Sequence, residues 1–234
     1  MMWLGVVHGQ QMLKNHDFKR MIPATTMMEA LKKSDIHFSG ELFPEFWWLN
    51  GRDVERPVEV SFNRGIQAEN HSGTVILSAR NYRIPVKAFR EDAAYRLELN
   101  ASGKGGVVFG FYCYGGNGKF LRNIVTGNAV LNEKEQIVGV NFRLQDIPGV
   151  EFLVPYFHFD GGFKVASASL LPMPLSDYKG NPLTEFSTLS SSKKQQMVLG
   201  SNDLSLLMHA ARDKDLDVRN RACYTLGELG EQAK

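Results

Sequence analysis

Aromatic side chains that alternate with apolar residues are the groups in this sequence best suited to bind a ligand. In the stretch FPEFWWLNG, Trp47 and Trp48 are adjacent, so a strand would turn them to opposite faces. If Trp47 faces the core, then Trp48 faces outward. Its indole ring offers a flat apolar plate with a polar N–H at the edge, which can stack on the C–H face of a pyranose ring. The alternative is that Trp48 packs beneath a neighbouring segment that contains Met27 and Met28.

Two further stretches show the same alternation. In FGFYCYGGNG, Tyr112 and Tyr114 should face outward beside a glycine-rich turn, and in VPYFHFDGG, Tyr156 and His158 alternate with phenylalanines. If these strands pair, the side chains could share one face with Arg96 of AYRLELNASG. Cross-strand covering of an exposed sheet face is an equally common reason for such pairs. The candidate ligand-binding residues are Trp48, Arg96, Tyr112, Tyr114, Tyr156 and His158.

Motifs for catalysis and metal binding are absent from the sequence. It contains no Gly-x-Ser-x-Gly elbow, no P-loop and no His-Glu-x-x-His motif. The histidines, at positions 8, 16, 37, 71, 158 and 209, do not have the spacing of a metal-binding set. Cys113 and Cys223 fall in regions assigned below to different modules, so no disulfide between them is expected. We therefore predict no catalytic residue, no metal site and no cofactor.

Composition and charge exclude several classes of protein. The chain has 234 residues, of which 43% are hydrophobic, and its net charge is +2 with basic and acidic residues interleaved. Nucleic acid is therefore not expected as a partner. No apolar run approaches the about 20 residues that a membrane span needs. Residues 1–9 form an N-terminal stub, which fits either a clipped signal peptide or an ordinary chain end.

Residues 10–172 have the pattern of an all-β domain. Short runs of β-prone residues alternate with clusters of Gly, Asn, Asp and Pro at the spacing of a sandwich. In AYRLELN, apolar and polar residues alternate, as in an antiparallel strand that is half buried. One segment differs: Thr26 and Glu29 have the spacing of a capping box and predict a short inserted helix from about Met27 to Lys33.

The composition changes after Pro172. Residues 173–200 are rich in Pro, Ser, Thr and Gly and are predicted to form a linker, which can be partly helical. In residues 201–234 the apolar period becomes helical. Asn202 or Asp203 should cap a first helix, and Asp215 or Asp217 a second one that stops at Gly230. The sequence therefore predicts a C-terminal helical hairpin.

This hairpin resembles a HEAT-type α-helical repeat. The residues that carry the resemblance are an acid-rich turn, Val-Arg, a small residue and Leu-Gly: Asp213, Asp215, Asp217, Val218, Arg219, Ala222, Leu226 and Gly227. A single helical pair cannot bury its own apolar face, and about three repeats are normally needed for stability. The resemblance implies that the chain is a piece of a longer repeat protein or that the pair docks on the sandwich.

The β region resembles carbohydrate-binding modules of the galactose-binding-like jelly-roll superfamily. The matching residues are Asn15, Asp17 and Phe18 in MLKNHDF, taken as the opening strand, then Pro44, Trp47, Leu49, Asn50 and Gly51, and the strand AYRLELNASG. The resemblance implies that Trp47 lies in the core. Members of this superfamily often hold a structural calcium ion with a last-strand carboxylate. Ala166 and Ser167 stand at those places here, so no calcium is expected.

These observations predict a mainly β fold, a jelly-roll sandwich with a short inserted helix, followed by a helical hairpin of HEAT type. The resemblance implies non-catalytic binding of a poly- or oligosaccharide by aromatic stacking, within a larger extracellular or periplasmic protein. The helical repeat could add protein partners. The alternative is a structural or protein-binding scaffold module without a sugar ligand, because a fold does not fix a function. A third option is an accessory domain of a degradative enzyme.

Overall fold

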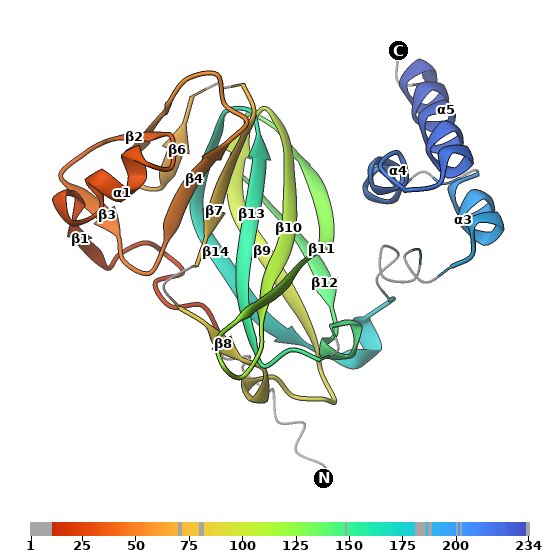
Figure 1. Cartoon of the computed structure of the whole chain (residues 1–234), viewed down its shortest axis with the longest axis horizontal. Coiled ribbons are helices and arrows are strands. Elements are labelled where there is room, and N and C mark those ends of the chain that lie inside the picture. Colours follow the sequence, from red (N-terminus) through yellow and green to blue (C-terminus); the bar gives the residue numbers. More distant parts are fainter. Residues whose placement is uncertain are drawn as a thin grey trace, which may run out of the picture. The chain divides into compact units, whose positions relative to one another are not determined.

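The structure is a computed structural model that describes residues 11–69, 72–79, 82–147, 149–180, 186, 189–199, 201 and 203–232. The chain divides into two compact units, Met1–Tyr178 and Lys179–Lys234, here called the β-unit and the helical unit (Figure 1). The expected stub at 1–9 lies outside the described residues. Within the described ranges, no helix has the length and apolar character needed to cross a membrane.

The β-unit is a sandwich of two sheets, which confirms the predicted mainly β fold (Figure 1). The first sheet has the order β11 (Phe120–Leu131), β10 (Gly105–Tyr114), β13 (Phe152–Asp160), β7 (Thr74–Ser78) and β4 (Trp48–Arg52), with β8 (Ile84–Pro85) also paired to β13. The second sheet has the order β12 (Gln136–Phe142), β9 (Ala94–Gly103), β14 (Phe163–Met173), β6 (Ile66–Ala68), β5 (Val58–Phe62) and β2 (Ile36–Ser39). Strands β2 and β5 are parallel, and the other paired strands of these sheets are antiparallel.

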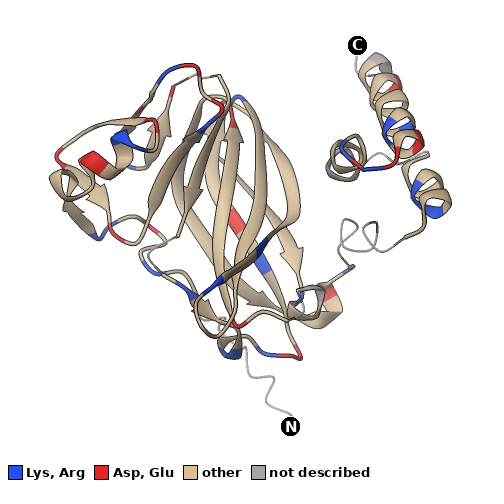
Figure 2. Cartoon of the chain, in the orientation of Figure 1, with Lys and Arg blue, Asp and Glu red and all other residues tan. Residues whose placement is uncertain are grey.

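Alternation along each long strand builds the core between the sheets. In β9, Leu97 and Leu99 are fully buried, whereas Arg96 and Glu98 remain partly exposed, as the sequence predicts. Phenylalanines and tyrosines of both sheets meet in the middle, for example Phe111 of β10 and Phe142 of β12, whose ring centroids are 4.8 Å apart. Figure 2 shows that charged side chains are sparse on the first sheet, whose described strands carry only Arg52, Arg122 and Asp160.

The inserted helix forms, but its predicted cap does not. Helix α1 (Met28–Lys32) follows a short 3₁₀ helix at Ala24–Thr26, and β1 (Met21–Pro23) pairs with β3 (Leu42–Pro44) beside it. The Thr26 hydroxyl donates to the carbonyl of Pro23 at 2.6 Å, and the helix has no side-chain cap. The predicted capping box does not form, because the Thr26 hydroxyl that should cap the helix is already bonded within the 3₁₀ turn.

The expected opening strand at MLKNHDF is a turn instead. Asn15 and Phe18 have φ of 50° and 54°, which a strand does not allow. The amide of Asn15 donates to the carbonyls of Arg20 and Glu45 and accepts from the Arg20 N–H. The Trp47 indole N–H donates to the Asn15 carbonyl at 3.1 Å, and its ring meets Phe18 edge-on. These residues thus contact one another in the core, as the resemblance implies for Trp47.

Phe186 and three helices make up the described core of the helical unit: α3 (Ser191–Val198), α4 (Leu204–Ala210) and α5 (Leu216–Gln232). Helices α4 and α5 form where the hairpin is predicted, whereas α3 falls inside the segment predicted as a linker. Asp203 caps α4 by accepting from the Leu206 N–H, and Asp215 accepts from the Val218 N–H at the start of α5. The predicted stop at Gly230 is wrong, since α5 continues to Gln232.

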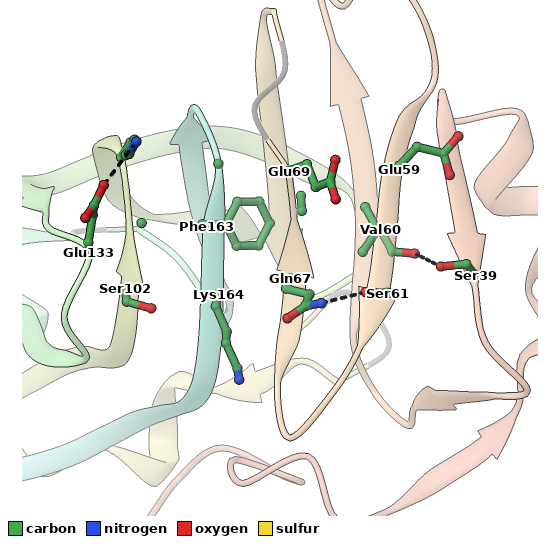
Figure 3. Close-up of a pocket in the computed structure, with 14 residues that line it drawn as sticks. Ser39, Glu59, Val60, Ser61, Gln67, Glu69, Ser102, Glu133, Phe163 and Lys164 are labelled. Carbon is green, nitrogen blue, oxygen red and sulfur yellow. Dashed lines mark hydrogen bonds and ion pairs between the residues drawn. The ribbon is translucent and has the colours of Figure 1, made fainter.

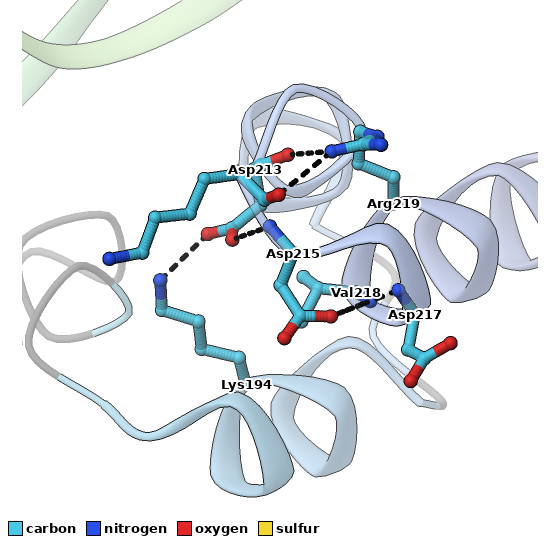
Figure 4. A network of polar contacts seen from close by, with 7 residues as sticks. Lys194, Asp213, Asp215, Asp217, Val218 and Arg219 are labelled. Carbon is cyan, nitrogen blue, oxygen red and sulfur yellow. Dashed lines mark hydrogen bonds and ion pairs between the residues drawn. The ribbon is translucent and has the colours of Figure 1, made fainter.

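A buried ion pair joins α3 to the turn before α5 (Figure 4). The Lys194 ammonium lies 2.7 Å from the Asp213 carboxylate, and their side chains are only 10% and 7% exposed. Asp213 also accepts from the Asp215 N–H, and Arg219 donates to the carbonyls of Asp213 and Lys214. Burial alone would raise the pKa of the Asp213 carboxyl, but the hydrogen bonds from Lys194 and from Asp215 outweigh it and lower this pKa.

Replacing Asp213 by Asn should destabilise the helical unit by about 3 kcal/mol, because the Lys194 ammonium would be left in a buried site without a counterion. Thermal unfolding of the full chain, followed by the circular dichroism signal of the helices, measures this loss. Asp217→Asn is the matched control, since Asp217 is exposed in the first turn of α5. Equal melting curves for the two variants would contradict a stabilising role for the buried pair.

Candidate ligand-binding site

The strand register brings five of the six candidate residues to the outer face of the first sheet. Trp48 pairs with Ser78, which in turn pairs with Tyr156. Residues that pair directly point to the same side of a sheet, so Trp48 and Tyr156 share one face. Their chain neighbours Leu49 and Phe157 are fully buried on the opposite, inner side. By the same alternation along β10 and β13, this outer face also carries Tyr112, Tyr114 and His158.

The sixth residue, Arg96, lies on the other sheet, so the expectation that it joins the tyrosines is wrong. It stands on the outer face of β9, where its guanidinium lies 2.8 Å from the Glu98 carboxylate and 3.3 Å from the Asn141 side-chain oxygen. Strand β10 follows β9 almost directly, but the chain crosses to the first sheet between them. Gly103 and Gly105, with φ of 157° and 102°, permit this crossing in a conformation that other residues rarely adopt.

Tyr156 forms the floor of the outer face and is itself fully buried. Its ring lies between those of Tyr112 and His158, with centroid distances of 4.6 Å and 4.4 Å, and its hydroxyl donates to the Ile124 carbonyl at 3.0 Å. A side chain at Gly110 would collide with the Tyr156 ring and the Ile124 carbonyl, so this glycine lets the ring lie flat. Tyr156 therefore supports the rings of the outer face from below.

The exposed part of this face is an aromatic platform made of Tyr112, Tyr114 and Phe120. Phe120 is 49% exposed, and its ring meets those of Tyr112 and Tyr114 edge-on at centroid distances of 6.3 Å and 5.8 Å. Phe120 is not among the candidates predicted from the sequence, because no strand is predicted at residues 120–131. The glycine-rich turn GGNG between two β-prone runs is the signal of a hairpin that places Phe120 opposite Tyr114.

Polar groups lie beside the platform. The Arg83 guanidinium lies 4.1 Å from the centre of the Tyr114 ring and donates to the Gly118 carbonyl at 3.0 Å. The Glu151 carboxylate lies next to Gly116 in the glycine-rich turn. A side chain at Gly116 would place its Cβ only 2.6 Å from the carboxylate oxygens. Asn123 pairs with Tyr112 and is exposed. Flat apolar rings next to hydrogen-bonding groups are suited to a ligand with apolar faces and a polar rim.

The cysteines and the possible metal ligands are described by their burial and grouping. Burial raises the pKa of the Cys113 thiol to about 11, so this side chain stays protonated and serves as a core residue. Within the ranges that the structure covers, no group of three or more His, Cys, Asp and Glu side chains is placed to hold a metal ion. Cys113 and Cys223 are both free thiols.

Searches against family models and curated proteins find no match to this chain. Among solved structures, it is similar to the enzymatically active domain of Bacteriophage CBA120 tailspike protein 4, with 13% identity, a TM-score of 0.39 and coverage of 55% of this chain and 20% of that chain. It is also similar to the CBM22-1 xylan-binding domain of Paenibacillus barcinonensis Xyn10C, with 12% identity, a TM-score of 0.36 and coverage of 55% and 86%.

A third similar structure is the family 11 carbohydrate-binding module of a cellulosomal cellulase from Clostridium thermocellum, with 12% identity, a TM-score of 0.39 and coverage of 56% of this chain and 91% of that chain. Several neighbours are thus carbohydrate-binding modules. TM-scores below 0.5 assign neither a family nor a ligand to this chain. Since no family model matches, the HEAT-type assignment of residues 201–234 stays a prediction.

His158 is held neutral on the outer face. Its Nε2 atom is buried and has no hydrogen-bond partner among the described residues, and its ring stacks on Tyr156. Burial and, to a smaller extent, the nearby Arg52 lower the pKa of His158 to about 4, and Asp160 partly opposes this shift. In the unfolded chain the histidine pKa is about 6.5, so protonation favours unfolding in the interval between these two values.

The stability of the β-unit should therefore be insensitive to His158 above about pH 6.5 and fall as the pH decreases toward about 4. Between about pH 7.5 and about pH 4.5, wild type should lose about 2–3 kcal/mol more than His158→Gln, in urea denaturation of the full chain. Ile137→Ala, which removes an exposed side chain of the second sheet and no titratable group, is the control and should lose as much as wild type. Equal losses for wild type and His158→Gln would contradict a buried neutral imidazole.

Proposed function

We propose that the β-unit is a non-catalytic carbohydrate-binding module that takes a poly- or oligosaccharide on the outer face of the first sheet. The observation that carries this proposal is the aromatic platform, in which Phe120 exposes half of its surface beside Tyr112 and Tyr114. Sugar rings would stack on these side chains, and Arg83, Asn123 and Glu151 would bond the hydroxyls. Affinity per site would be modest unless several sites act together.

The other candidate residues have supporting roles in this proposal. Trp48 lies in the same row of the sheet as Tyr156, with Ser78 between them, and would extend the surface toward β4. Tyr156 holds Tyr112 in place from below, and the neutral imidazole of His158 would accept or donate a hydrogen bond. Arg96 has no part, because it lies on the opposite face of the sandwich.

The sequence resemblance to galactose-binding-like jelly rolls supports the same function, and the core contacts of Asn15, Phe18 and Trp47 agree with that fold. In this proposal the module belongs to a larger extracellular or periplasmic protein, and the helical unit is a partial HEAT-type repeat. These assignments rest on the sequence pattern alone.

A protein scaffold is the second candidate function, and the helical unit favours it. Tyr224 on α5 is 65% exposed, and Leu199 after α3 is 58% exposed. Both line a groove of about 500 Å³ between α3 and α5, together with polar side chains of Asn220 and Arg221. Exposed apolar residues at a groove are typical of surfaces that bind protein.

Affinity electrophoresis of the full chain in gels that contain soluble xylan, galactan, mannan or mixed-linkage glucan tests the first proposal. Wild type should be retarded by at least one polymer, and Tyr112→Ala and Phe120→Ala should each weaken binding by about tenfold, the effect of losing a central aromatic contact. Two controls should bind as wild type does. Ile137→Ala removes an apolar side chain that is 66% exposed on the second sheet. Arg96→Ala removes a charged side chain from the outer face of the same sheet, away from the platform.

Unfolding curves of each variant separate loss of binding from loss of fold. Retardation that persists in the Tyr112 and Phe120 variants would overturn the platform as the site. No retardation of folded wild type by any polymer would favour the scaffold instead.

A further inference from the structure

A row of polar side chains crosses the outer face of the second sheet. Direct pairing aligns Ser39 with Ser61, Ser61 with Gln67, Gln67 with Lys164 and Lys164 with Ser102. The row therefore runs across five strands and, at about 4.8 Å per strand spacing, is about 19 Å long. Each hydroxyl or amide in it can both donate and accept hydrogen bonds, so the row suits a long ligand rich in hydroxyl groups.

This row is the floor of a groove of about 820 Å³ (Figure 3). Gln67 donates to the Ser61 hydroxyl at 3.0 Å, which fixes the middle of the floor. Glu59 and Glu69 lie along the rim of the groove. Lys104 and Glu133 also line the groove, and the Lys104 ammonium lies 3.0 Å from the Glu133 carboxylate. Recognition in this groove has to be polar, because its one aromatic lining residue, Phe163, is only 3% exposed.

Lys164 is the distinctive group of the groove. Its side chain is partly buried, yet it forms no hydrogen bond or ion pair with the described residues. By contrast, Lys104 forms an ion pair with Glu133, and the Glu59 carboxylate lies 2.7 Å from the His37 ring nitrogen. In Figure 3 the Lys164 side chain extends away from Glu59 and Glu69. An ammonium group without a counterion favours an anionic ligand group, and charge-assisted hydrogen bonds are about twice as strong as neutral ones.

We propose that this groove is a second binding site, which takes an acidic polysaccharide with the carboxylate of a hexuronate unit on Lys164. The flanking sugar units lie along Ser61, Gln67 and Ser102 and form hydrogen bonds through their hydroxyls, and the Glu69 carboxylate accepts hydrogen bonds from sugar hydroxyls at the rim. The site lies on the opposite face of the sandwich from the aromatic platform and does not depend on it. The two surfaces differ in chemistry: one is apolar and suits neutral sugar rings, and the other is polar and suits charged ones.

Isothermal titration of the full chain with a polygalacturonate oligomer, in buffer with EDTA, tests this site. Lys164→Met keeps the length of the side chain and removes its charge, and it should weaken binding by about tenfold. Ser61→Tyr fills the middle of the groove and should abolish binding. Lys87→Met is the matched control, an exposed lysine of the 3₁₀ helix Val86–Ala88 that should change affinity by less than about twofold. Melting curves verify that each variant is folded.

Two further probes separate this site from the platform and from simple charge attraction. Tyr112→Ala and Phe120→Ala should bind polygalacturonate as wild type does, whether or not they bind neutral polymers. Dextran sulfate carries sulfate in place of carboxylate, and it should bind more weakly than polygalacturonate and without dependence on Lys164. Four results would each overturn the proposal: no binding of polygalacturonate, undiminished binding by Lys164→Met, loss of binding in the platform variants, or Lys164-dependent binding of dextran sulfate alone.

Discussion

Burial of alternate side chains between the two sheets is the constraint on which both outer faces depend. Phe109 and Phe111 of β10 and Phe157 of β13 are fully removed from water, and each such side chain contributes about 2–3 kcal/mol. Because the period of a strand is two, a slip by one residue would place all of these rings in solvent. The core therefore fixes the register, and the register fixes that Tyr112 and Tyr114 point outward on the first sheet.

The same local alternation explains what the sequence could predict. In β9 and β10 the inward residues are apolar, so their faces can be read directly from the pattern. The pattern does not say which sheet a strand joins, since pairing is non-local, and for that reason Arg96 was expected beside the tyrosines. Strand β11 is hard to predict for a related reason: Asn123 and Asn128 on its outward side are polar, but Phe120, Val125 and Val130 on that side are apolar, which weakens the alternation.

The helical unit shows the same division between local and distant interactions. Asp203 and Asp215 cap helices within three residues of their partners, and both caps lie at positions that the sequence predicts. The Lys194–Asp213 pair joins residues 19 apart in the chain, and the sequence has no periodic signal for it. Helix α3 has a low apolar content, with lysines and glutamines in its middle, so composition alone favours a linker there. Its burial against α5 arises from tertiary contacts.

Two faces with different chemistry can coexist on one sandwich because the core separates them. The platform gathers rings on a sheet with few charges, and the groove gathers hydroxyls and one unpaired ammonium group on the other. A ligand on one face would contact no residue of the other, and the effects of substitutions at distant sites that share no partners usually add independently. The two surfaces can therefore vary independently in sequence. A substitution at Lys164 leaves the ring stack of Tyr112 and Tyr156 intact, just as a substitution at Phe120 leaves the serine row aligned.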